Sequence, residues 1–186
     1  MSDAVELLPS AFAAFTDRVF AVPPHGWDAR TPCTEWSVRD LVNHVTSEHL
    51  WVPELLAGST IDEVGDRFSG DVLGEDPNGA WVRAHSASQA AWASTPADKP
   101  VHLSFGTVPA TEYAEQLLVD LTVHAWDLAR GAGADERLPA DLITHALAYA
   151  REHADELSHS GMFGEPVTTE AADEQTQLLA LLGRRV

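Results

Sequence analysis

The feature that most constrains the fold is a helical spacing of apolar residues that recurs along most of the chain. Leu8, Phe12, Phe15 and Val19 follow one another at intervals of four, three and four, which predicts one apolar side on a helix over about residues 3–22. Each such stripe must be buried against another element. A chain dominated by these stripes is therefore expected to fold as packed helices.

Further helices are indicated by the same spacing and by residues typical of helix ends. Ser37 is expected to begin the second helix, because its hydroxyl can accept from the backbone N–H near Asp40. Pro109 suits the start of the fourth helix, and Gly131 and Gly133 suit its end. The predicted helices cover about residues 3–22, 37–56, 78–93, 109–130 and 139–157, with a short helix at 173–182.

The rest of the chain shows little β character. Residues 101–106 alternate with period two and predict a short strand or hairpin arm, and residues 58–77 are rich in Gly, Asp and Ser and predict a long surface loop. We predict an all-α fold: an antiparallel four-helix bundle with additional short helices and at most a short β arm. Residues 1–160 are expected to form this bundle, and residues 161–186 a tail whose short helix packs on the same domain.

The charge of the chain excludes some partners. Eleven basic residues against 29 acidic ones give a formal net charge of −18. Nucleic-acid affinity depends on Lys and Arg neutralising phosphates, so no nucleic-acid partner is expected, and anionic membrane surfaces are disfavoured for the same reason. No apolar run approaches the ~20 residues that cross a bilayer.

The single cysteine, Cys33, rules out an intramolecular disulfide framework and agrees with a reducing compartment. The first residues lack a positive segment followed by an apolar one, so they do not resemble a signal peptide. These observations predict a cytoplasmic protein that is a monomer or a homodimer.

Three polar residues interrupt the apolar stripes of two predicted helices. Asp120 and His124 are four apart, so their side chains share the inward face of the fourth helix. A buried carboxylate without a partner is costly, so a positive group is expected to face Asp120. His44 lies in the same way on the stripe of the second helix. The three residues predict a divalent metal site built between facing helices.

Two imidazoles and one carboxylate are a common catalytic zinc set, which leaves a coordination position open for water or substrate. Nickel, iron(II) or manganese suit the same donors, so zinc is the first expectation and not the sole one. The spacing also fits a simpler interpretation, in which Asp120 orients His124 as a buried ion pair.

Three stretches of the chain resemble one protein family. They are residues 27–44 (WDARTPCTEWSVRDLVNH), residues 120–129 (DLTVHAWDLA), and a C-terminal signature that runs from FGEP at 163–166 to LLALLGRR at 178–185. All three are similar to motifs of the mycothiol-dependent maleylpyruvate isomerase-like metal-binding proteins. The resemblance covers nearly the whole chain and implies a DinB-like four-helix bundle with a central metal.

The isomerase uses a histidine on the second helix and a Glu-x-x-x-His pair on a later one, and the resemblance carries these ligands over to His44, Asp120 and His124. Asp120 is one methylene shorter than the glutamate, which alters its reach. The isomerase also resembles a two-domain protein, whereas a short tail follows the bundle here.

The resemblance implies a function as a mycothiol-type transferase or isomerase, with mycothiol as co-substrate and a small electrophile as substrate. Coordination to the metal would lower the pKa of the thiol and yield the nucleophilic thiolate. Two alternatives stay open. One is a metal-dependent hydrolase that acts through a bound hydroxide, and the other is a metal-binding or small-ligand-binding bundle without turnover.

Four residues near the predicted ligands have undecided roles. Cys33 precedes the helix that bears His44 and is otherwise a small buried apolar residue. Glu48 lies one turn beyond His44 and could be a base or a fourth ligand, or could pair with an arginine, and His49 lies beside that face. Asp127 could accept the free N–H of His124 or could pair with Arg130.

A last stripe is formed by His145, Tyr149 and His153 on the fifth predicted helix. No acidic partner is expected to face these residues from the interior. We therefore expect them to have a surface or core role.

Overall fold

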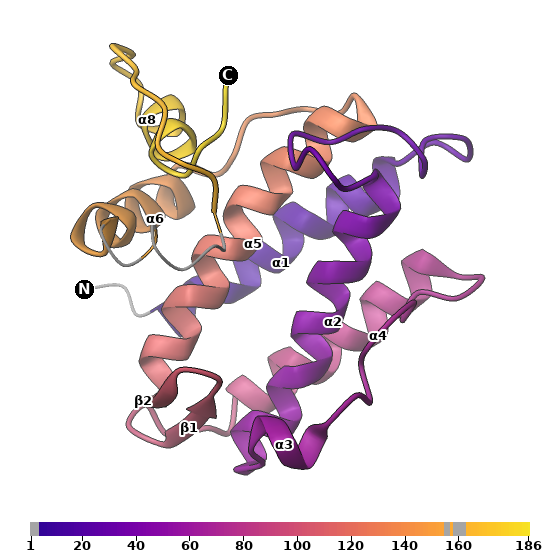
Figure 1. Cartoon of the computed structure of the whole chain (residues 1–186), viewed down its shortest axis with the longest axis vertical. Coiled ribbons are helices and arrows are strands. Elements are labelled where there is room, and N and C mark those ends of the chain that lie inside the picture. Colours follow the sequence, from indigo (N-terminus) through magenta and orange to yellow (C-terminus); the bar gives the residue numbers. More distant parts are fainter. Residues whose placement is uncertain (1–3, 155–156, 158–162) are drawn as a thin grey trace.

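The computed structural model describes residues 4–154, 157 and 163–186, and helices dominate it (Figure 1). The predicted all-α class is confirmed. In chain order the elements are α1 (Ala4–Ala21), α2 (Val38–Ala57), α3 (Ile61–Val64), α4 (Pro77–Trp92), β1 (Pro100–Leu103), β2 (Gly106–Pro109), α5 (Ala110–Ala132), α6 (Ala140–Glu152) and α8 (Glu174–Leu181).

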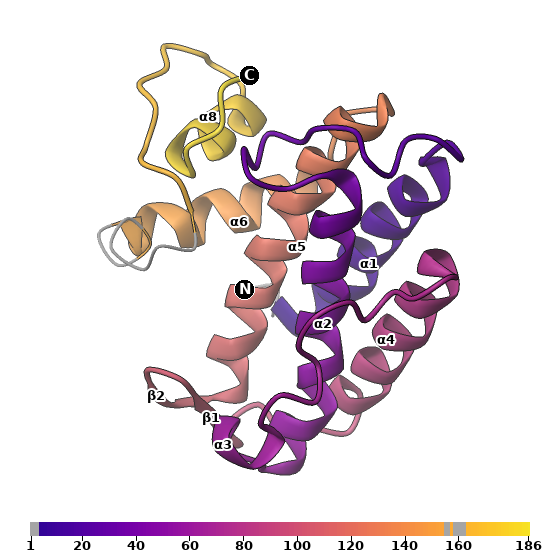
Figure 2. The same ribbon diagram turned by 45° about the vertical axis from the view of Figure 1, so that its right-hand side comes forward.

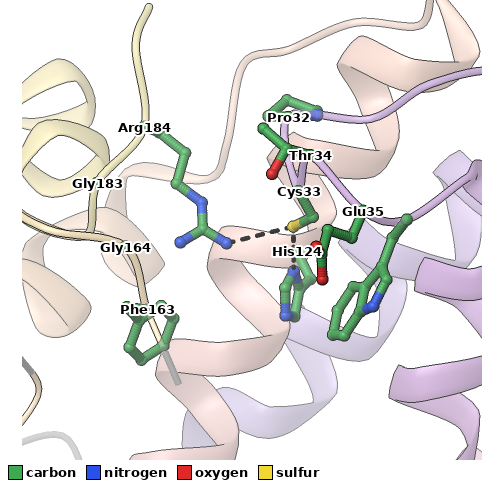
Figure 3. A pocket seen from close by; sticks show the side chains of 10 residues that line it. Pro32, Cys33, Thr34, Glu35, His124, Phe163, Gly164, Gly183 and Arg184 are labelled. Carbon is green, nitrogen blue, oxygen red and sulfur yellow. Dashed lines mark hydrogen bonds between the residues drawn. The ribbon is translucent and has the colours of Figure 1, made fainter. Parts of the chain in front are cut away.

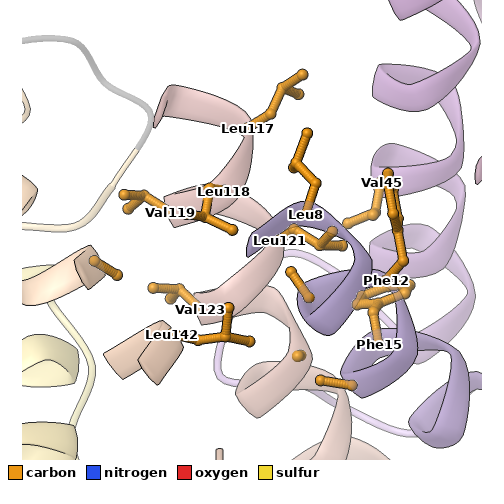
Figure 4. Packing of buried hydrophobic residues seen from close by; sticks show 14 of the residues in the cluster. Leu8, Phe12, Phe15, Val45, Leu117, Leu118, Val119, Leu121, Val123 and Leu142 are labelled. Carbon is orange, nitrogen blue, oxygen red and sulfur yellow. The ribbon is translucent and has the colours of Figure 1, made fainter. Parts of the chain in front are cut away.

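Helices α1, α2, α4 and α5 form the four-helix bundle. Helix α1 lies against α5, α2 lies against α4, and α2 also contacts α5 (Figure 2). The predicted stripe of α1 is fully buried, and Phe12 and Phe15 meet Val45 of α2 and Leu121 of α5 in the centre of the core (Figure 4). Burial of each such side chain contributes about 1.5–3 kcal/mol. Two of the helices that converge here, α2 and α5, also carry the candidate site.

The start of α2 follows the prediction. Ser37 precedes the helix and its hydroxyl accepts from the Asp40 backbone N–H, while the Asp40 carboxylate accepts from the Ser37 N–H at 2.9 Å. This reciprocal pair satisfies two donors that the first turn leaves free. The loop before α2 is thereby fixed against the helix that bears His44.

The end of α5 lies two residues beyond the prediction. Gly133 ends the helix with φ +67°, as expected for a terminal glycine, but Gly131 is still helical. A Cβ at Gly131 would lie 2.9 Å from Val38 Cγ2 and 3.1 Å from Thr31 Cγ2. The glycine therefore permits close approach of the loop before α2 to the end of α5.

The structure refines several other predicted boundaries. The predicted loop at 58–77 contains the single-turn helix α3, and the predicted arm is a two-stranded antiparallel hairpin that continues to Pro109. Helix α6 ends at Glu152 rather than Leu157, and residues 155 and 156 lie outside the described residues. Helix α8 packs on α6, whereas the division at residue 160 lies outside the described residues and stays a prediction.

The expectation that the stripe on α6 has no acidic partner is wrong. His145 Nε2 lies 2.6 Å from Glu115 Oε2, and the Tyr149 hydroxyl donates to Glu112 Oε1 at 2.7 Å. Both carboxylates come from the first two turns of α5, so the contacts join α6 to α5. Their acidic partners lie on a different helix, which the spacing on α6 does not reveal.

In the described part of the chain, no helix combines the length and the apolar character that crossing a membrane requires.

Helix α2 buries a second face that its apolar stripe does not predict. His49, expected beside the His44 face, is 1% exposed and lies in the core, with its Nδ1 3.1 Å from the Ser88 hydroxyl of α4. The Phe12 ring packs edge-on against it at 4.9 Å between centroids. Burial lowers the pKa of His49 to about 3, since an imidazolium would lose its hydration there. Of the nearby groups, Asp120 raises the pKa of His49, while His85 and His44 lower it further.

A neutral buried histidine makes stability depend on pH. Between the unfolded pKa near 6.5 and the folded value of about 3, the unfolded chain binds a proton that the folded chain excludes, so stability falls as pH falls. The replacement His49→Gln removes this term. We expect the free-energy difference between wild type and variant, measured by urea unfolding, to shrink by up to about 1.4 kcal/mol per pH unit below pH 6. A difference that is constant from pH 8 to pH 4.5 would contradict this account.

Candidate metal centre

The three side chains singled out from the sequence come together between α2 and α5. His44 extends from α2, and Asp120 and His124 extend from successive turns of α5 because they are four residues apart. His124 Nε2 lies 3.3 Å from Asp120 Oδ1, and His44 Nε2 lies 3.8 Å from Asp120 Oδ2. One donor atom from each residue lies within 4.8 Å of the other two.

The group is buried on one side and accessible on the other. The His124 side chain is 4% exposed, whereas those of His44 and Asp120 are 29% and 24% exposed. The Trp36 indole covers part of the site, with its ring centroid 4.7 Å from that of His44 and 5.8 Å from that of His124. A small molecule can therefore approach the donors without unfolding the bundle.

The electrostatics of the group favour a cation. Burial opposes charge on Asp120, but His124 and His44 outweigh it and hold the pKa of this carboxyl well below its usual range. Burial likewise opposes charge on His124, yet Asp120 and Asp127 raise its pKa well above the usual value. With no metal bound, the two carboxylates thus favour the positively charged form of the His124 ring. A metal ion at Nε2 would replace that positive charge.

Asp127 contacts the other ring nitrogen of His124. The His124 Nδ1–H donates to Asp127 Oδ2 at 2.9 Å, and Asp127 is fully buried. Of the two interpretations left open for Asp127, the structure has the contact with His124, whereas Arg130 pairs with Glu136. Donation from Nδ1 to Asp127 leaves Nε2 directed at Asp120 and His44, as metal-binding histidines require.

Cys33 lies on the same side of His124 as Asp127. Its thiol donates to Asp127 Oδ2 at 3.3 Å and lies 3.9 Å from His124 Nδ1. It lines a cavity of about 410 Å³ between the loop at 32–36 and the C-terminal segment (Figure 3). Cys33 is thus next to His124 but lies across its ring from the other two candidate ligands, His44 and Asp120.

Arg184, which the sequence reasoning missed, lines the same cavity. Its guanidinium lies 2.8 Å from Asp127 Oδ2 and 3.5 Å from Cys33 Sγ. Cys33, His124 and Asp127 also have donor atoms within 4.8 Å of one another, but Arg184 already neutralises the charge of Asp127 and donates to Cys33. The set of His44, Asp120 and His124 is therefore the better fit to a metal ion, which stays a prediction.

Glu48 borders the site from the next turn of α2. Burial raises the pKa of its carboxyl, an effect that His44 opposes and Asp120 reinforces. His124 opposes it as well, so the charge of Glu48 interacts with all three candidate ligands. Whether it is a base or a fourth ligand stays open.

Zinc binding at this site is expected to stabilise the protein. At a free zinc concentration of 100 times Kd, the gain is about 2.7 kcal/mol, or on the order of 5–10 °C in Tm for a chain of this size. We expect His44→Ala to abolish this shift. His25→Ala, at an exposed histidine before α2, is the matched control and should keep it. An equal shift in all three proteins would indicate binding elsewhere.

Comparison with known proteins places this geometry in a family. The sequence matches the mycothiol maleylpyruvate isomerase N-terminal domain over residues 8–129. It is 30% identical over 141 residues to two uncharacterised proteins of Mycobacterium tuberculosis, from strains CDC 1551 / Oshkosh and ATCC 25618 / H37Rv. That match covers 76% of this chain and 72% of each relative.

Two solved structures share the fold. They are the mycothiol-dependent maleylpyruvate isomerase, at a TM-score of 0.62 and 18% identity, and a histidine-to-alanine mutant of it, at 0.64 and 17%. Each match covers 84% of this chain and 69% of the isomerase chain. At this identity the likeness concerns the fold, whereas the domain match covers well over half of the sequence. The chain belongs to the mycothiol maleylpyruvate isomerase N-terminal domain family.

Proposed function

We propose that this protein is a divalent-metal-dependent enzyme that uses a low-molecular-weight thiol of the mycothiol type. The enzyme either transfers the thiol to a small electrophilic substrate or uses the thiol to isomerise that substrate. The observation that carries the proposal is the meeting of His44, Asp120 and His124 between α2 and α5, with one side accessible. The family supports the choice of thiol, since the isomerase of known structure is described as mycothiol-dependent.

His44, Asp120 and His124 would hold the metal, with zinc first and nickel, iron(II) or manganese as alternatives. A metal bound there supplies the acidity that converts a coordinated thiol into thiolate near neutral pH. Asp120 would contribute a negative charge, because the two imidazoles keep its carboxyl group ionised. Its shorter side chain, compared with glutamate, sets how near the donors lie to α5.

Other residues would position the reactants and move the proton. Glu48 is proposed to accept the thiol proton, since burial raises its pKa towards the working range of a base. The sulfur then forms a bond to the electrophilic carbon, and the leaving group departs with its electron pair. In isomerisation, the same sulfur adds to one carbon of the substrate's double bond, which becomes a single bond. The substrate rotates about that bond, and the sulfur leaves as the double bond forms again. Trp36 covers one side of the imidazoles and would exclude water from them.

A binding protein without turnover is the second candidate. The family match is to an N-terminal domain, and the structural match covers 69% of the isomerase chain. The remaining part of the isomerase has no counterpart in these matches. A bundle that binds metal and thiol without reaction would fit this observation.

We also propose a cytoplasmic setting, and a monomer or homodimer as the oligomeric state. The support for the compartment is the single cysteine, Cys33, which forms no disulfide within the chain.

A conjugation assay separates the two candidates. Zinc-loaded protein is mixed with mycothiol and chloro-dinitrobenzene, and the S-conjugate is measured by absorbance. We expect a rate above the uncatalysed reaction that falls to background in His124→Ala, which loses a donor, and at least 10²-fold in Asp120→Asn, which loses the negative charge of a donor. His25→Ala should keep the full rate. Background rates in the wild type, with zinc still bound, would favour the binding protein; a His124→Ala variant as active as wild type would overturn the proposed site.

A further inference from the structure

The C-terminal segment approaches α5 and places a cation beside the candidate metal centre. Arg184 is 8% exposed and follows α8, whereas its main partner, Asp127, lies on α5 and is fully buried. Arg184 Nε donates to Asp127 Oδ1 at 3.3 Å, and its NH2 group donates to Asp127 Oδ2 at 2.8 Å. This two-bond contact fixes both the position and the plane of the carboxylate.

The remaining contacts hold the guanidinium in one orientation. Its NH1 group donates to the Leu182 carbonyl at 2.7 Å, NH2 also donates to Cys33 Sγ, and the Phe163 ring lies 5.5 Å from the guanidinium carbon. Burial lowers the pKa of Arg184, but Asp127 outweighs burial and raises it. The side chain is thus held as a permanent cation by groups from three parts of the chain.

A close backbone contact in the tail places Arg184. Gly183 has φ +83°, and a Cβ on it would lie 2.6 Å from the Gly164 backbone. No side chain fits at this crossing, so the segment at 163–164 lies directly on the turn before Arg184. Phe163 and Arg184 consequently face the same cavity (Figure 3).

The chain of contacts ends at a candidate ligand. Asp127, held by Arg184, accepts from His124 Nδ1 at 2.9 Å, and the opposite nitrogen lies 3.3 Å from Asp120. We propose that Arg184 is a positioning residue for the metal centre: it orients Asp127, which in turn directs His124 Nε2 towards His44 and Asp120. The inference rests on the proposed function and extends it to the tail.

Zinc affinity in a double-mutant cycle tests this chain of contacts. Kd is measured by competition with a chromophoric chelator for wild type, Arg184→Met, Asp127→Asn and the double variant. We expect each single change to weaken zinc binding about 10–100-fold, as losses of such supporting contacts do. If Arg184 acts through Asp127, the double variant binds zinc as each single variant does, rather than with the product of both losses.

Two further variants separate positioning from general stability. Arg185→Met, at an exposed neighbour, is the matched control and should leave Kd unchanged. Arg184→Lys keeps the charge without the two-bond geometry, and should fold even where Arg184→Met does not. We expect it to bind zinc at least threefold more weakly than wild type.

The outcomes distinguish the two proposals. A wild type that binds none of zinc, nickel, iron(II) and manganese overturns the metal site, and this inference with it. A wild type that binds zinc, with unchanged Kd in Arg184→Met or Arg184→Lys, leaves the metal site standing and overturns the role of Arg184. Multiplicative losses in the double variant also overturn that role, because they show that Arg184 and Asp127 act independently.

Discussion

The packing of α2 against α5 includes a partly buried negative charge. Asp120 lies between two imidazoles that come from different helices, and its carboxylate stays ionised because His44 and His124 compensate the loss of water. An acid at this depth would otherwise oppose the packing of α2 against α5. The packing of the apolar core therefore has to leave both histidines within a few ångströms of one carboxylate, as it does here.

His124 connects two sets of charges across a single ring. Its Nε2 faces Asp120, and its Nδ1 donates to Asp127, which Arg184 neutralises in turn. Helix α5 carries both acids within eight residues, so they keep a fixed separation. Because an acid contacts each ring nitrogen, the ring is held from both sides in the described structure. The two sides of the ring therefore differ: Asp127 and the buried Arg184 lie at Nδ1, and the solvent-accessible side chains of His44 and Asp120 lie at Nε2.

Much of the fold could be predicted because apolar spacing reports which side of a helix is buried. The stripe of α1 and the Ser37 cap were correct, and the approach of His44 to the α5 pair followed from two stripes that face each other. His49 was misplaced because α2 is buried on two sides, against α5 and α4, while its stripe describes the first. Helix α3 was missed because four residues are too few for a periodicity.

The position of Arg184 in the site could not be predicted from the sequence for another reason. Its partner Asp127 is 57 residues away, and no local pattern in the tail indicates an inward cation. The sequence did place Asp127 within reach of His124, but it offered Arg130, three residues on, as an equal partner. Choosing between them required the path of the tail, which depends on the contact between Gly164 and Gly183.

The distance along the chain between Cys33 and Arg184, 151 residues, has a consequence for biosynthesis. At about 5–20 residues per second, a ribosome adds the arginine roughly 8–30 s after the cysteine. The two histidines and the acid of the centre are all translated before it. The segment that covers Cys33 and His124 is thus made after the residues that it covers, and the nascent bundle presents its donor atoms to the surrounding medium until that segment is in place.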